Sequence, residues 1–258
     1  MNISVMIDSI PALLGGAGLT LQLVGLAVVI GFVIAVLVAL ARLSRSPLLW
    51  LPAYGFVFFF RGTPLLVQIF LIYYGLSQFS AVRDSALWVI LREPFWCALI
   101  AFSLNTAAYS AEIVRGAIQA VPRGQIEAAM AIGMSRLTRL RRIVMPQAVR
   151  IGLPAYGNEV ILLIKASSLA STVTLLDLTG VARTISSVNY MPVELLSMAA
   201  LIYLAMTFVV TRAFKVIEYL LSGDRRQPPT AVPLPDQPVP DQSLPPDHPL
   251  PVASGKTK

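Results

Sequence analysis

The chain has 258 residues, of which 56% are hydrophobic and only 13% are charged, and its mean hydropathy is +0.74. A soluble domain needs a polar surface that this composition lacks, so the sequence predicts an all-α integral membrane protein. The formal net charge of +7 does not indicate nucleic-acid binding, because the positions of the basic residues are explained by membrane orientation.

Apolar windows of about 20 residues are long enough to cross a hydrocarbon core of about 30 Å as helices. No basic residue precedes Arg42, and the first window is too long for the apolar core of an export signal, so we interpret it as a retained span. Residues 1–17 are expected to lie outside, on the periplasmic side, and residues 18–222 to form the transmembrane domain. The five predicted spans lie near Gly18 to Ala41, Ala53 to Gln78, Phe95 to Val114, Leu153 to Thr172 and Leu195 to Phe214.

Basic residues are concentrated in alternate connecting segments. Residues 42–52, residues 115–152 and the chain from Arg212 onward hold 15 of the 20 Lys and Arg residues. Positively charged loops stay on the cytoplasmic side, so the amino terminus is predicted outside and the carboxyl terminus inside, with an odd number of spans. The intervening loops hold only Arg83, Arg92 and Arg183.

The second window contains a charge and two helix-breaking residues. Gly62 and Pro64 follow Arg61, so the helix is expected to break there and to leave backbone groups that need partners. Arg61 can bind the carboxylate of a transported solute, or it can close the break and extend towards the inner surface. The structural role is favoured, because long basic side chains near helix ends usually reach the membrane interface.

The third window carries polar residues at helical spacing. Asn105, Tyr109 and Glu112 are separated by four and then three residues, so they share one helix face. They either line a solute pathway or hydrogen-bond to neighbouring helices, and the second arrangement is common in bundles. Glu112 can also pair with Arg115. The single cysteine, Cys97, is expected to pack in the apolar interior, and it excludes an internal disulfide and a thiolate metal cluster.

A basic segment, residues 115–152, connects the third and fourth windows. Gln125 to Ile132 and Arg136 to Ile143 are predicted helices, joined by a turn at Gly133, which can adopt the positive φ of a helix end. Ser135 is expected to cap the second helix.

Pro146 is expected to end that second helix. Ala128 and Ala129 leave a low surface that lets another protein approach closely, with Glu127 beside them. Physical reasoning alone leaves two interpretations open: a docking surface for another protein, or a solvated loop folded as an interfacial amphipathic helix.

The fourth window is also interrupted by polar residues, and residues 173–187 are expected to form a shorter helix on the outer side. Irregular backbone at that depth is tolerated only beside protein or a water-filled cavity. The sequence therefore predicts a pathway-lining region shared with a second subunit, in which a lysine would repel a cation but attract a carboxylate. The polar residues are Asn158, Glu159, Lys165, Ser167 and Ser168.

Residues 223–258 form a proline-rich segment, with ten prolines between positions 228 and 251, and are expected to be a disordered cytoplasmic tail. The only histidine, His248, lies here, so no histidine-based catalytic or metal site is expected. Gly255-Lys256-Thr257 is similar to the end of a phosphate-binding loop, but Leu250 stands where that loop needs a glycine. No nucleotide or other cofactor is therefore expected on this chain, and ATP would be bound by a partner.

The central segment resembles the EAA loop of binding-protein-dependent ABC transporter permeases. Glu127-Ala128-Ala129, Gly133, Ile143 and Met145-Pro146 have the spacing of that loop, with Met145 where leucine is usual. The resemblance implies an ABC type I importer permease fold, in which residues 115–152 form a coupling loop that seats in a cleft of the ATP-binding subunit. The residues that it implies for docking are Glu127, Ala128, Ala129, Gly133, Ile143 and Pro146.

Further motifs are similar to the polar amino acid branch of these permeases, and most of all to its M-type subunits of the histidine/lysine/arginine/ornithine, arginine and opine systems. Together they cover roughly residues 15–220, and the proline-rich tail departs from the pattern. The resemblance implies a permease subunit, not an enzyme, that imports basic amino acids across the bacterial inner membrane by alternating access. The motifs are residues 61–68, 105–112 and 153–160, with 67–75, 158–162 and 167–170 carrying the M-type likeness.

The partners that the resemblance implies are two copies of an ATP-binding subunit, which hydrolyse the ATP, a second permease subunit and a periplasmic amino acid binding protein. The second permease is either a Q-type homologue or another copy of this chain. No catalytic or metal-binding residue is expected. The candidates for the substrate pathway are Asn105, Tyr109, Glu112, Arg61, Lys165, Ser167 and Ser168.

Two other functions compete with this one. An ion-coupled secondary amino acid transporter also has polar groups in broken helices, but it needs no central loop, and it usually has an internal repeat that is absent here. A non-transporting membrane adaptor would use the loop alone and has no need of Glu112, Glu159 or Lys165 inside the membrane. Uptake that requires both ATP and a binding protein distinguishes the importer from both.

Overall fold

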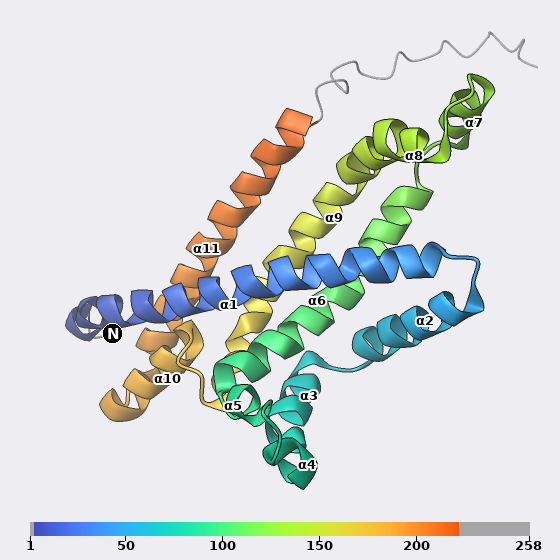
Figure 1. The fold of residues 1–258 in the computed structure, drawn as a ribbon. Helices are drawn as coiled ribbons and strands as arrows, with labels where there is room; N and C mark the ends of the chain where they lie inside the picture. The colour runs from blue at the N-terminus through green and yellow to red at the C-terminus, as the bar shows by residue number, and fades with distance from the viewer. Residues whose placement is uncertain (1–2, 222–258) are drawn as a thin grey trace, which may run out of the picture. The chain divides into compact units, whose positions relative to one another are not determined.

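In the computed structural model residues 3–221 are described, and every regular element among them is helical (Figure 1). The all-α class predicted from the composition is therefore confirmed. The proline-rich tail, with its predicted disorder and His248, lies outside the described residues. The α-helices are α1 (Ile3–Leu43), α2 (Pro47–Gly62), α3 (Leu65–Phe70), α4 (Ser80–Arg83), α5 (Trp88–Leu91), α6 (Pro94–Gln119), α7 (Arg123–Ala131), α8 (Arg136–Arg139), α9 (Met145–Ala166), α10 (Leu178–Asn189) and α11 (Pro192–Leu221).

Within the described residues, α1, α6 and α11 are each long and apolar enough to cross a membrane alone. Two bent helix pairs pass the same test as broken spans: α2 with residues 65–78, bent by 106°, and residues 136–173 with α10, bent by 49°. These units correspond to the five predicted windows, whereas the number of spans and their orientation stay predictions. α1 already begins at Ile3, so residues 3–17, predicted to lie outside, continue into the first span without a break.

The seam between α1 and α6 is the most extensive helix contact, and α9 also packs on α6. Gly31 permits the close approach of α1, because a Cβ atom there would lie only 3.0 Å from the carbonyl oxygen of Ser103. α6 contributes a series of small buried residues, which let its neighbours approach closely: Ala98, Ala101, Ala107, Ala108 and Ala111.

The second predicted span breaks at the position that the sequence indicated. α2 ends at Gly62, Thr63 is extended with ψ of 143°, and Pro64 starts a new direction towards α3. The π-helical turn η1 (Leu71–Gly75) and the 3₁₀ turn η2 (Leu76–Gln78) complete this unit. The break therefore lies directly after Arg61 and Gly62, beside the charge predicted in this window.

The central segment folds as predicted in its first part. α7 ends in a turn at Gly133, whose φ is +76°, and Ser135 caps α8 by accepting a hydrogen bond from the Thr138 amide at 3.3 Å. The expectation that Pro146 ends the second helix is wrong. The helix passes without a break from α8 through the π-helical turn η3 (Leu140–Val144) into α9, and Pro146 is accommodated because it directly follows this wider turn.

The fourth span changes geometry at the predicted serines. α9 gives way to a 3₁₀ segment, η4 (Ser167–Val173), and the chain then turns through Thr174, whose φ is +67°. The shorter outer helix begins at Leu178 rather than at residue 173, because Asp177 caps it by accepting hydrogen bonds from Gly180 N at 3.0 Å and Thr179 N at 3.3 Å.

Candidate functional site

The first candidate region is a helical hairpin made of α7, the turn at Gly133 and α8, residues 123–139, which we call the EAA hairpin. It projects beyond the end of α6 and the start of α9, on the side away from α3 and α4 (Figure 1). Its first helix is attached to the bundle by a hydrogen bond from Gln147 Nε2 to Gln125 Oε1. Ile126 packs on a small apolar cluster made of Ala117, Val121, Val144 and Ala148.

The predicted docking residues divide into exposed and inward-facing positions. Glu127 and Ala128 are exposed on α7 and Pro146 is exposed on α9, whereas Ile143 is half-buried. Ala129 is only 2% exposed, so its side chain faces its own chain and lets α7 pack closely. Gly133 is exposed and supplies the turn, with a φ of +76°.

Three exposed apolar residues of the hairpin were missed by the sequence analysis. Met130, Ile132 and Leu137 are 49%, 73% and 74% exposed, and the last two lie on either side of the turn at Gly133. Large apolar side chains in a basic segment are the signal that could have found them. Together with Glu127 they give the hairpin an apolar tip with an acidic group beside it, which is suited to binding a protein.

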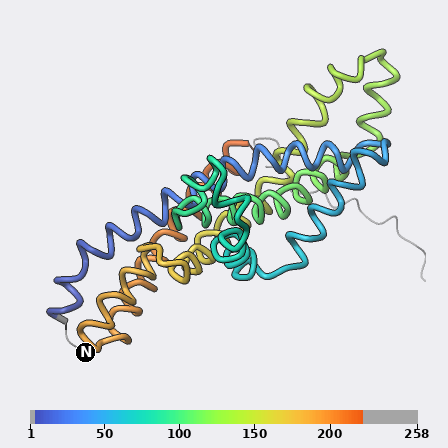
Figure 2. The backbone as a smooth tube through the Cα atoms, turned by 60° about the horizontal axis from the view of Figure 1, so that its bottom comes forward, coloured from blue at the N-terminus to red at the C-terminus, as the bar shows by residue number. Residues whose placement is uncertain are grey.

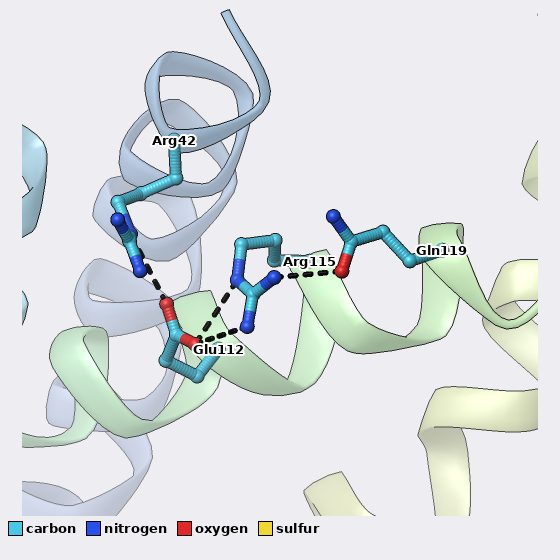
Figure 3. A network of polar contacts seen from close by, with 4 residues as sticks. All are labelled: Arg42, Glu112, Arg115 and Gln119. Atoms are coloured by element: carbon cyan, nitrogen blue, oxygen red, sulfur yellow. Dashed lines mark hydrogen bonds and ion pairs between the residues drawn. The ribbon is translucent and has the colours of Figure 1, made fainter. Parts of the chain in front are cut away.

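The second candidate region contains the polar residues of the spans, and Glu112 is its most heavily bonded member (Figure 3). Arg42 Nε of α1 lies 3.3 Å from Glu112 Oε1, and Arg115 Nη2 lies 2.6 Å from Oε2. Arg115 also donates to Gln119 at 2.7 Å. The predicted pair with Arg115 is confirmed, and Arg42, which the sequence analysis missed, makes the carboxylate a bridge between α1 and α6.

Asn105 and Gln68 close the break between α2 and α3. Gln68 Nε2 donates to Phe60 O at 2.9 Å and to Thr63 O at 3.0 Å, and Asn105 Nδ2 donates to Gln68 Oε1 at 3.0 Å. Both side chains are buried, so these bonds satisfy carbonyl groups that the break frees inside the membrane. Gln68 was not predicted to act here; its position four residues after Pro64 was the available signal.

Arg61 does not close the break that it was predicted to close. Its guanidinium carbon lies 5.2 Å from the ring centroid of Tyr109, a cation–π distance, and its side chain is exposed in the single chain. The three α6 residues predicted to share a face therefore contact three different neighbours: Gln68, Arg61 and Arg42.

Glu159 is a further polar group of the spans. Its half-buried carboxylate accepts a hydrogen bond from Thr106 Oγ1 at 3.2 Å, and Arg61 lies within Coulombic range of it. On the same helix Asn158 and Lys165 are exposed and are seven residues apart, so they share one face.

The two predicted serines of η4 bond within their own segment. Ser167 Oγ is buried and donates to Ile164 O at 2.6 Å, and Ser168 Oγ donates to Lys165 O at 2.8 Å. Both hydroxyls thus satisfy carbonyl groups at the end of α9. Within residues 3–221, no group of three or more His, Cys, Asp and Glu side chains is placed to hold a metal ion.

Comparison with known proteins gives matches over most of the chain. Residues 5–222 match the family described as "Binding-protein-dependent transport system inner membrane component". The octopine transport system permease protein OccM of Rhizobium meliloti is 53% identical over 226 residues, which are 88% of this chain and 92% of OccM. The nopaline transport system permease protein NocM of Agrobacterium fabrum is 52% identical, over 88% of this chain and 94% of NocM.

A more distant relative and two solved structures also match this chain over most of its length. The histidine/lysine/arginine/ornithine transport system permease protein HisM of Escherichia coli is 41% identical, over 79% of this chain and 86% of HisM. The crystal structure of an amino acid ABC transporter with histidines matches with a TM-score of 0.77 and 36% identity, over 85% of this chain and 99% of the other. An inward-facing structure of the MetNI methionine ABC transporter is 18% identical with a TM-score of 0.67, over 83% and 98% of the two chains, and supports the fold alone.

Proposed function

This chain belongs to the family of binding-protein-dependent transport system inner membrane components and is the permease subunit of an ABC importer, and on that premise we propose that it imports basic amino acids or opines. Relatives of the chain are permeases for octopine, nopaline and the basic amino acids, which supports this substrate class. ATP hydrolysis belongs to a separate subunit, and transport proceeds by alternating access.

The EAA hairpin is the proposed docking surface for the ATP-binding subunit. Its exposed Glu127 has no partner among the described residues, and the apolar side chains at its tip are left open. The hairpin packs on the ends of α6 and α9, which carry Glu112 and Glu159. A displacement of the hairpin by ATP-driven closure would therefore be passed on to both polar helices.

The polar face of the spans supports a pair of permease subunits. An Arg or Lys side chain costs about 2.5 to 3.5 kcal/mol at the bilayer centre, so contact of the exposed Arg61 and Lys165 with lipid tails is unfavourable. A second permease covering this face would enclose a polar pathway. The partner is a Q-type homologue or a second copy, joined by two ATP-binding subunits and by a periplasmic binding protein on the outer loops.

The observation that carries the substrate assignment is the group formed by Glu159, Thr106 and Arg61. A half-buried carboxylate with a single hydrogen-bond donor can take a cationic side chain of the substrate, while the nearby guanidinium can take its carboxylate. Lys165 adds a second cation on α9. Asn105 and Glu112 are already bonded within the chain and are proposed to hold helices together.

The test is reconstitution of the chain in proteoliposomes with its second permease, ATP-binding subunit and binding protein. We expect uptake of labelled arginine, histidine, lysine, ornithine or octopine to require both ATP and the binding protein. Uptake driven by an ion gradient alone would contradict the proposal. Glu159→Gln is expected to lower uptake of the cationic substrate at least tenfold, whereas Glu93→Gln, an exposed glutamate beyond the polar region, should keep it within twofold.

A further inference from the structure

A large apolar cavity of about 580 Å³ lies between α1, α6 and the first half of α9. It extends along α1 from Val28 to Leu40, and Leu40, Ile118 and Leu140 line one end of it. Its volume lies in the range of about 300 to 1,000 Å³ that is typical of sites for small ligands. The cavity is separate from the Glu159 group described above.

The walls of this cavity admit only an apolar occupant. Its side chains are aliphatic or aromatic, and the only side-chain polar group, the hydroxyl of Tyr156, is directed to the carbonyl oxygen of Val28 at 3.5 Å. A charged amino acid would lose its hydration there without gaining a hydrogen bond, which excludes the cavity as the solute pathway. In a membrane the apolar molecules at hand are lipid acyl chains.

A cationic residue, Arg141, lies next to the end of the cavity that Leu140 lines. Arg141 follows Leu140 and precedes Met145 by four residues, and both of those residues line the cavity. Residues four apart along a helix share a face, so Arg141 lies at the end of the cavity. Its side chain is exposed, and it has no ion pair within residues 3–221. Under the positive-inside rule this end is cytoplasmic, at the depth of lipid head groups.

We propose that this cavity is a binding site for an anionic phospholipid, with an acyl chain between α1, α6 and α9 and the phosphate at Arg141. The positive charge of Arg141 complements the anionic phosphate of the head group, and the apolar walls of the cavity complement the acyl chain. Because Leu140 belongs to the helix that continues from the EAA hairpin into α9, the bound lipid would support the base of the docking surface. The inference rests on the proposed orientation, which cysteine accessibility at the hairpin tests independently.

The experiment measures lipid retention by the purified complete transporter with native mass spectrometry, using palmitoyl-oleoyl phosphatidylglycerol and palmitoyl-oleoyl phosphatidylcholine as probes. We expect phosphatidylglycerol to be retained at least fivefold better than phosphatidylcholine. Arg141→Gln should abolish this preference, whereas Arg142→Gln, which removes the neighbouring charge, should keep it within twofold. A preference that survives Arg141→Gln would overturn the proposal.

The apolar part of the site is tested on α1. Val33→Trp fills the cavity and should lower retention of both lipids at least fivefold, whereas Leu204→Trp, on an exposed face of α11 outside the cavity, should not. Equal retention in these two variants would overturn the proposal. A photo-crosslinking residue at position 33 is expected to form an adduct with the mass of a phospholipid; an adduct with another subunit would assign the cavity to a protein contact instead.

Discussion

Two glutamates fifteen residues apart, Glu112 and Glu127, have opposite surroundings. The carboxylate of Glu112 is occupied on both oxygens by Arg42 and Arg115, from two helices, and its side chain is only 16% exposed (Figure 3). Glu127 is exposed on α7, without a partner in the described part of the chain. The hairpin that carries α7 lies at one end of the helix bundle (Figure 2). The first holds this chain together, and the second is open to another protein.

Structural and functional charges in a membrane protein can be distinguished by whether they are already bonded within the chain. An ionisable group inside a bilayer must be bonded, so a saturated pair such as Arg42 with Glu112 stabilises the bundle before it can serve transport. A charge that stays exposed on the EAA hairpin, without a partner in the described chain, has no structural task there. Removing polar groups from each region in turn tests whether the two glutamates have these different roles.

The largest effect is expected from Glu112→Gln. The substitution leaves two largely buried guanidinium groups facing each other without a carboxylate, and should lower the free energy of unfolding by about 3 kcal/mol. Denaturant unfolding of the purified chain in micelles measures it. The control is Glu93→Gln, which removes an exposed pair with Arg92 and should cost less than about 1 kcal/mol. Equal effects would mean that Glu112 is not structural.

Gln68→Leu is expected to follow, with a loss of about 2 kcal/mol, because the half-buried Thr63 carbonyl loses its Gln68 donor and Asn105 Nδ2 loses its acceptor, while the Phe60 carbonyl keeps only the 3.3 Å bond from Asn105. The same unfolding measurement applies. Gln78→Leu removes an exposed amide with one long bond to Tyr74 O, and should change stability by less than about 0.5 kcal/mol. If both variants were as stable as the parent, the break between α2 and α3 would not depend on Gln68.

Glu127→Lys is expected to weaken binding of the ATP-binding subunit and to leave the stability of the chain unchanged, unlike Glu112→Gln and Gln68→Leu. The free energy of unfolding is expected to change by less than about 0.5 kcal/mol, because the side chain is exposed. Affinity for the ATP-binding subunit is expected to fall about tenfold, which corresponds to about 1.4 kcal/mol. Co-purification and surface binding measure it, with Glu93→Lys as the matched charge reversal away from the hairpin. Unchanged attachment would remove Glu127 from the docking surface.

The smallest effect is expected from Gly133→Ala, at about 1 kcal/mol, because alanine is strained at a φ of +76°. Gly124→Ala on α7 should be neutral or slightly stabilising, because an added Cβ atom there has no other atom within 4 Å. Circular dichroism and unfolding of the two variants test whether the hairpin turn depends on glycine. A stable Gly133→Ala variant would show that another residue can supply the turn.

Much of the EAA hairpin could be predicted because its signals are local. Gly133 and Ser135 act on the backbone within a few residues, and the turn and the cap were found where expected. Pro146 is the exception, since its effect depends on the π-helical turn before it, which widens the helix and which no residue preference announces.

The class of protein, the apolar windows, the break after Gly62 and the change of geometry at Ser167 could be predicted from the residues alone, because hydropathy and backbone preferences are local properties. Which charged and polar groups meet depends on the packing of the helices. The Arg42 pair with Glu112, the Gln68 bond with Asn105 and the Thr106 bond with Glu159 join residues 70, 37 and 53 positions apart. Such contacts depend on how helices rotate and cross, and close packing at sites such as Gly31 sets that rotation.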